Sequence, residues 1–102
     1  MAITVTGKNY EEEVVNAKER VLLDFHATWC GPCKMLSPVL QEIEKDDNDF
    51  KICKIDIDQS PELAEQFQIM SVPTLVVMEA GKVVKKSSGV RPKEEILSMM
   101  SL

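Results

Sequence analysis

The sequence has no excess of positive charge and no long apolar run, and each of these shortages excludes a class of protein. Its 12 Lys and Arg stand against 17 Asp and Glu, which leaves a formal net charge of −5 at pH 7. Neutralisation of phosphates supplies most of the affinity for nucleic acids, so an acidic chain without a basic stripe is not expected to bind them. No segment approaches the roughly 18 consecutive apolar residues of a membrane-spanning helix, so we expect no membrane association.

A secretory signal and a disulfide framework are missing as well. Residues 1–13 lack the basic and apolar regions of a signal peptide, which predicts a cytoplasmic protein whose thiols are kept reduced. The three cysteines are an odd number and too few for a framework of structural disulfides. Internal repeats and low-complexity segments are also absent. The 102 residues, 44% of them hydrophobic, therefore predict a single domain spanning residues 1–102.

The pattern of apolar residues predicts alternating strands and helices. Strands are expected at residues 3–6, 21–27, 51–58, 75–78 and 82–88, and helices are expected to begin near residues 10, 31, 60 and 91. Ser60 is expected to cap the third helix, with Pro61 at its first position. The order βαβαβαββα predicts an α/β fold with helices on both faces of a sheet that ends in an antiparallel hairpin.

The chemistry is expected at Cys30-Gly31-Pro32-Cys33, between a buried strand and the start of a helix. The free N–H groups and positive dipole of a helix N-terminus stabilise a thiolate. Pro32 suits the first helical turn and places Cys30 outermost, so we expect an exposed attacking Cys30 and a shielded resolving Cys33. As a structural cross-link such a short ring contributes only about 2 kcal/mol, but it closes quickly and favours reversible oxidation.

Zinc binding is the main alternative for this cysteine pair. Zinc requires four ligands, and the chain offers Cys30, Cys33, Cys53 and its single histidine, His26. Zinc fingers usually supply a second closely spaced pair, whereas Cys53 and His26 stand alone on predicted strands, so we expect no metal site. The simplest interpretation of Cys53 is a small buried hydrophobic residue, and that of His26 is a structural histidine. A cationic His26 near the thiols would instead lower a thiol pKa.

The segment Asp24–Met35, with the sequence DFHATWCGPCKM, resembles the active-site segment of the thioredoxin family, and the similarity extends over nearly the whole chain. Further matching positions are Pro38, Lys54 to Asp58, Val72-Pro73-Thr74, Gly81 and Gly89. His26 departs from the family pattern, which commonly has Trp or another aromatic residue there. The resemblance implies a thioredoxin fold with a central mixed five-stranded sheet, and a monomeric protein-disulfide reductase without a bound cofactor. Its implied partners are disulfide-containing client proteins and a thioredoxin reductase that supplies electrons. In this family the reductase is an NADPH-dependent flavoprotein or, in some organisms, a ferredoxin-dependent enzyme.

The same resemblance assigns roles to individual residues. Cys30 matches the nucleophile, Cys33 the resolving thiol of the redox disulfide, and Asp24 a buried acid/base, while Lys54 matches a lysine that modulates the carboxylate. Pro73 matches a proline whose preceding peptide bond is cis. The implied docking surface for clients consists of Trp29, Gly31, Pro32, Val72, Pro73, Gly89 and Val90.

The residues around Asp24 support its burial independently of the resemblance. Apolar residues flank it at both odd and even positions of the strand, which implies that both faces of the strand are covered. Desolvation is expected to raise the pKa of Asp24, which would allow it to accept and return the proton of Cys33. The alternative function is a non-enzymatic binding subunit whose docking depends on the redox state of the cysteine pair.

Overall fold

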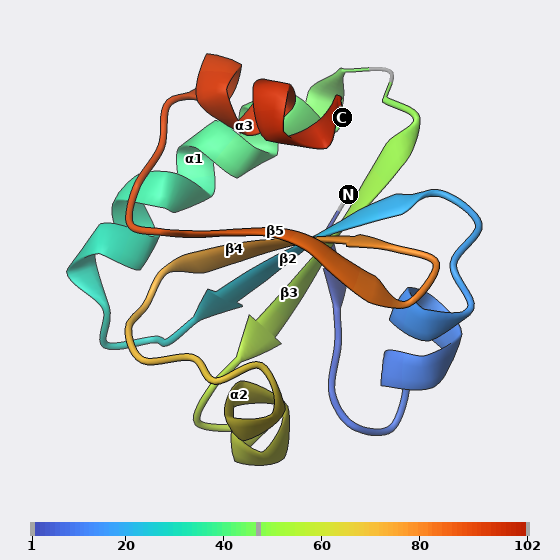
Figure 1. Ribbon diagram of the computed structural model, residues 1–102. Helices are drawn as coiled ribbons and strands as arrows, with labels where there is room; N and C mark the ends of the chain where they lie inside the picture. Colours follow the sequence, from blue (N-terminus) through green and yellow to red (C-terminus); the bar gives the residue numbers. More distant parts are fainter. Residues whose placement is uncertain (1, 47, 102) are drawn as a thin grey trace.

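A five-stranded mixed sheet with the strand order β1-β3-β2-β4-β5 forms the centre of the protein (Figure 1). The computed structural model of the protein describes residues 2–46 and 48–101. β1, β2 and β3 run parallel, whereas β4 is antiparallel to both β2 and β5. The mixed sheet expected from the sequence is therefore confirmed. The strands are β1 (Ile3–Thr4), β2 (Arg20–His26), β3 (Phe50–Asp56), β4 (Thr74–Glu79) and β5 (Lys82–Ser88).

Helices cover both faces of the sheet. α1 (Gly31–Lys45) and α3 (Lys93–Met100) lie on one face, and η1 (Glu11–Val15) and α2 (Pro61–Gln66) lie on the other (Figure 1). The predicted order of elements is confirmed, but the winding of the first helix was not foreseen. In η1 the Asn16 N–H donates to the Glu11 carbonyl five residues earlier at 2.9 Å, so this segment is a π-helix. Packing rather than propensity decides the winding of so short a helix.

The two faces of the sheet carry two separate apolar cores, which accounts for the continuous burial of β2. Leu22 packs against α1 and α3, while Leu23 and Phe25 pack against the side of η1 and α2. Side chains alternate along a strand, so Asp24 lies on the face of Leu22, toward α1. In none of the described helices is there a segment long and apolar enough to cross a membrane.

The turn between β3 and α2 is built differently from the prediction. Ser60 does precede Pro61, but its side chain makes no capping hydrogen bond, and its Oγ is buried without a partner among the described residues. Asp56 orders the turn instead, because its Oδ1 accepts the backbone N–H of Asp58 at 2.8 Å and that of Gln59 at 3.3 Å. Asp56 thus orders the turn that leads into α2, while the Ser60 side chain is buried and leaves the helix without the expected side-chain cap.

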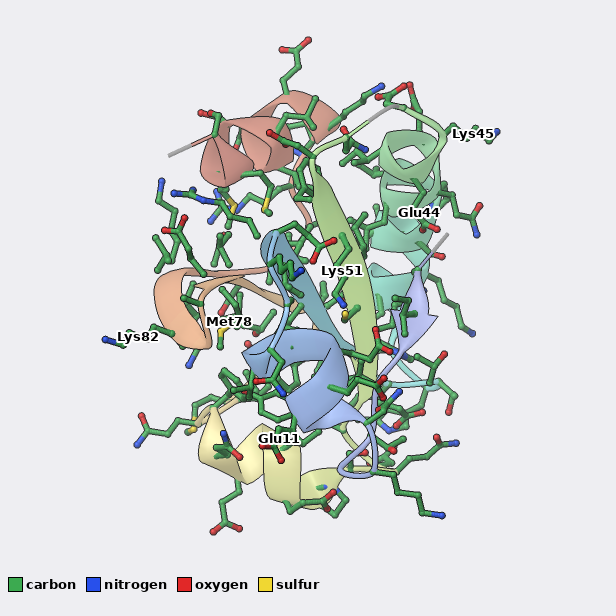
Figure 2. The ribbon with its side chains drawn as sticks, turned by 90° about the vertical axis from the view of Figure 1, so that its right-hand side faces the viewer. Glu11, Glu44, Lys45, Lys51, Met78 and Lys82 are labelled. Atoms are coloured by element: carbon green, nitrogen blue, oxygen red, sulfur yellow. A yellow bond between two sulfur atoms is a disulfide. The ribbon has the colours of Figure 1, made fainter. Side chains whose placement is uncertain are left out.

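The β4–β5 hairpin closes through Ala80 and Gly81, as expected. Their φ angles of 52° and 78° lie in the left-handed region that a two-residue hairpin turn requires. Lys82, the first residue of β5, projects outward from this hairpin, whereas Met78 on β4 lies inside the molecule (Figure 2). β5 is an edge strand, and lysines along such a strand discourage pairing with other chains.

Candidate active site

Cys30 and Cys33 form a disulfide at the N-terminus of α1, with their Cα atoms 5.3 Å apart. Cys30 is the N-cap residue of this helix, with an extended backbone, and Pro32 lies in its first turn. The Sγ of Cys30 accepts the backbone N–H of Cys33 at 3.1 Å. The sulfur therefore lies at the positive end of the helix dipole, in contact with a donor that stabilises negative charge on a thiolate.

Both cysteines are buried in this disulfide state, so the expected exposure of Cys30 is wrong. Cys30 is 3% exposed and Cys33 is 8% exposed. The cover comes from Ile57 and Val72, which pack against the pair, and the carbonyl oxygen of Val72 lies 3.6 Å from the Cys30 sulfur. Val72 is far from Cys30 in the sequence, and for that reason the local helix geometry alone gave the wrong exposure.

The loop before β4 brings the predicted docking residues to the disulfide. The Val72–Pro73 peptide bond is cis, and the Gly89 N–H donates to the Pro73 carbonyl at 2.9 Å. Two connections distant in the sequence, before β4 and after β5, are thereby joined beside Cys30. Around them Trp29, Gly31, Pro32 and Val90 are exposed, whereas Val72 and Gly89 are half-buried and Pro73 is buried.

Trp29 has a specific partner that the sequence did not reveal. Its side chain is 66% exposed, and its indole N–H donates to Oδ2 of Asp58 at 2.8 Å. Asp58 is itself held by the turn in which Asp56 accepts its backbone N–H. Asp58 lies within a segment that matches the thioredoxin pattern, but nothing in a single sequence indicates that its carboxylate reaches a tryptophan 29 positions earlier.

Asp24 is buried in the middle strand, as predicted, with 3% of its surface exposed. Burial raises the pKa of Asp24 from 3.8 to about 6, and the positive charge of Lys54 opposes this rise. Lys54 stands directly opposite Asp24 in the pairing of β2 with β3. The Oδ1 of Asp24 has no hydrogen-bond partner among the described residues. Cys33, Leu36 and Leu40 share the inward side of α1, so Cys33 faces the side of the sheet that carries Asp24.

The four candidate zinc ligands are not brought together. Leu23 on β2 pairs with Cys53, so Cys53 belongs to the core on the η1 and α2 side, whereas His26 lies on the opposite face of the sheet. Cys53 is fully buried, and burial raises its pKa to about 11, which fits the prediction of a packed apolar residue. No cluster of three or more potential metal ligands occurs in the part of the chain that the structure describes.

His26 is half-buried and stands opposite Asp56 in the sheet. Burial lowers the pKa of His26 below its ordinary value of 6.5. The charge of Lys54 lowers it further, and that of Asp56 opposes both effects. The lowered pKa disfavours the cationic form of His26 that would activate the thiols.

A disulfide at a helix N-terminus, on a mixed sheet with a cis-proline loop beside it, defines a thiol–disulfide oxidoreductase. The model of the Thioredoxin family matches residues 1–102. The chain belongs to the thioredoxin family, whose members act as protein-disulfide reductases.

Individual relatives agree with this assignment. The chain is 42% identical over 100 residues to a thioredoxin of Mycobacterium tuberculosis, a match that covers 97% of this chain and 86% of the relative. It is 40% identical over 102 residues to a bifunctional thioredoxin reductase/thioredoxin of Mycobacterium leprae, covering 99% of this chain but only 22% of that longer protein. Among solved structures, a mutant thioredoxin of Halobacterium salinarum superposes with a TM-score of 0.88 at 32% identity, over 97% of this chain and 87% of the other.

Proposed function

We propose that Cys30 is the attacking nucleophile and Cys33 the resolving thiol in the reduction of client disulfides. The Cys30 thiolate attacks one sulfur of the client disulfide, forms a mixed disulfide and releases the other client sulfur as a thiolate. Cys33 then attacks the Cys30 sulfur, which regenerates the Cys30–Cys33 disulfide and releases the second client thiol. The observation that carries this assignment is the position of Cys30 as the N-cap residue, with its sulfur accepting the Cys33 N–H.

In this proposal Asp24 accepts the proton of Cys33 and returns it when the pair is reduced again. With a pKa of about 6, the carboxyl group is mostly ionised at pH 7 yet holds a proton more readily than an exposed aspartate. Lys54, opposite it in the sheet, stabilises the ionised form and so modulates its basicity. The orientation of Cys33 toward this face of the sheet supports the pairing of the two groups.

Clients are proposed to dock on the surface around the disulfide, against the uncharged side chains of the predicted docking residues. The predicted docking residues Trp29, Gly31, Pro32 and Val90 are exposed there, next to the cis-proline loop. An extended client backbone placed beside Val72 would need few specific side chains, which suits a reductase with many protein substrates.

Re-reduction is assigned to an NADPH-dependent flavoprotein thioredoxin reductase. The name of the M. leprae relative, which joins a thioredoxin reductase to a thioredoxin, supports this pairing. We further propose that residues 1–102 act as one monomeric domain in the cytoplasm and carry no bound cofactor. The single continuous sheet and the family match over the same residues support the one-domain assignment.

Trapping of mixed disulfides tests the proposal. A Cys33→Ser variant keeps the nucleophile but lacks the thiol that releases the client, so it should form covalent adducts with insulin that dithiothreitol reverses. The matched Cys30→Ser variant should form far fewer adducts, because it lacks the sulfur that accepts the N–H at the start of α1. Digestion and mass spectrometry should locate the cross-link at Cys30.

Two outcomes would contradict the proposal. Adducts that form mainly through Cys33 would reverse the assigned roles. If the protein with both Cys30→Ser and Cys33→Ser still bound its partners while the wild type reduced no insulin, the chain would be a binding subunit rather than a reductase.

A further inference from the structure

The methionines of the described chain divide into two exposed and three buried residues. Met35 is 67% exposed and Met70 is 93% exposed. Met78, Met99 and Met100 are at most 8% exposed, and Met78 is visible inside the molecule in Figure 2. A thioether on the surface is open to peroxides, whereas one packed in a core is shielded.

Both exposed methionines lie within four positions in the sequence of residues of the proposed docking surface. Met35 follows Gly31 by four residues and Pro32 by three on α1, so it lies on their face of the helix. Met70 precedes Val72, whose carbonyl oxygen contacts the Cys30 sulfur, by two residues. Methionine is common on surfaces that bind many partners, because its side chain is flexible and polarisable.

The other sulfur atoms of the described chain are protected in the oxidised protein. Cys30 and Cys33 are already joined to each other. Cys53 is fully buried in the core, where it remains an unreactive thiol. Under peroxide stress the accessible reduced sulfurs of the described residues are therefore the thioethers of Met35 and Met70.

We propose that Met35 and Met70 are oxidation sites through which peroxide weakens the docking of protein clients. Each thioether loses two electrons to hydrogen peroxide. One peroxide oxygen becomes the sulfoxide oxygen and the other leaves as water. A client that covers the sulfoxide must remove water from a strongly polar group, whereas the unmodified thioether is apolar. The inference rests on the docking surface proposed above, and it leaves the thiol chemistry of Cys30 and Cys33 unchanged.

The test compares a protein substrate with a small disulfide. The oxidised protein is treated with hydrogen peroxide, its disulfide is reduced briefly with dithiothreitol, and the desalted protein is mixed with insulin or with oxidised glutathione. Peptide mapping should find the added oxygen on Met35 and Met70 before it appears on the three buried methionines. The second-order rate constant with insulin should fall about tenfold, equivalent to about 1.4 kcal/mol, while that with glutathione changes less than twofold.

Leucine variants supply the controls. The Met35→Leu/Met70→Leu protein should reduce insulin with the same rate constant before and after peroxide treatment. The Met99→Leu protein, changed at a buried position, should show the same fall in this rate constant as the wild type. The inference is overturned if the buried methionines oxidise equally fast, if complete oxidation leaves the insulin rate unchanged, or if the double-leucine protein also loses it. An untreated protein that fails to reduce insulin would overturn the proposed function itself, and with it this inference.

Discussion

At the scale of single residues, Asp24 is the group whose chemistry departs most from its behaviour in water. Its pKa is raised from 3.8 to about 6 because the carboxyl group is buried and the protonated form is favoured. Relative to a carboxyl group that stays ionised, the protonated Asp24 contributes its full stabilisation below pH 3.8, the pKa of the unfolded chain. This stabilisation is lost as the pH rises through the pKa of about 6 in the folded chain. A difference of this size corresponds to about 3 kcal/mol of destabilisation at pH 8, moderated in practice by local relaxation.

We therefore expect Asp24→Asn to raise the free energy of unfolding of the oxidised protein by about 1–3 kcal/mol at pH 8. The gain should shrink toward pH 4, where Asp24 is protonated in the folded chain and partly protonated in the unfolded chain. Urea unfolding at pH 4, 6 and 8 measures it. Asp49→Asn, at an exposed position, serves as the control and should stay within about 0.5 kcal/mol of wild type throughout. A gain in stability that does not vary with pH would contradict the raised pKa of Asp24. The Asp24→Asn variant should also exchange disulfides more slowly than the wild type.

Residue roles could be predicted from the sequence where local patterns decide them. The burial of Asp24 followed from the apolar residues on both sides of it, and the helix start at Cys30 followed from Gly-Pro. The exposure of Cys30 and the partner of Trp29 could not be predicted. Both depend on segments that approach only in the folded chain, the loop at Val72 and the turn at Asp58.

At the scale of secondary-structure elements, the C-terminus of α2 is tied to the edge strand β5. The Nζ of Lys86 donates to the carbonyl of Phe67 at 2.9 Å and to that of Gln68 at 3.2 Å. These carbonyls follow the helix, at its negative end, where a cation is stabilising. Gln68 adopts a φ of 55°, the left-handed conformation with which many helices end. The chain from this point leads directly to Val72, so Lys86 helps to fix the origin of the loop that covers the disulfide.

Lys86→Met should lower the free energy of unfolding by about 0.5–1 kcal/mol, because the ammonium group is lost while most of the aliphatic side chain is kept. Guanidinium unfolding at pH 7 measures the change. Lys82→Met provides a matched control on the same strand, and it should change the stability by less than about 0.5 kcal/mol. Equal stabilities of the two variants would show that Lys86 contributes no more than any surface lysine.

The order of strands and helices was predictable because periodicity and turn residues are properties of short segments. The details at their ends were less predictable. Pro61 begins α2 as expected, yet the ordering contacts come from Asp56 rather than Ser60. The π-helical winding of η1, in which Val14 is buried in the core, is likewise not indicated by a local pattern.

At the scale of the whole molecule, folding and redox state are linked through the Cys30–Cys33 ring. Closing a ring between residues only three apart restricts the unfolded chain and stabilises the oxidised fold by about 2 kcal/mol relative to the reduced one. Unfolding and reduction form a closed thermodynamic cycle. The free energy of reducing the disulfide must therefore differ between the folded and the unfolded chain by the same amount. For a two-electron couple it corresponds to about 40 mV, with the disulfide of the folded protein harder to reduce.

Guanidinium unfolding of the oxidised and the dithiothreitol-reduced protein at pH 6 should therefore give a reduced form less stable by about 2 kcal/mol. The Cys30→Ser/Cys33→Ser protein controls for the reductant and should unfold identically with and without it. If the two redox forms were equally stable, new favourable interactions in the folded reduced protein would offset the stability that is lost when the ring opens. Reduction would then relieve unfavourable interactions around the buried pair, and the potential would be set by packing against Val72 and Ile57 rather than by ring closure.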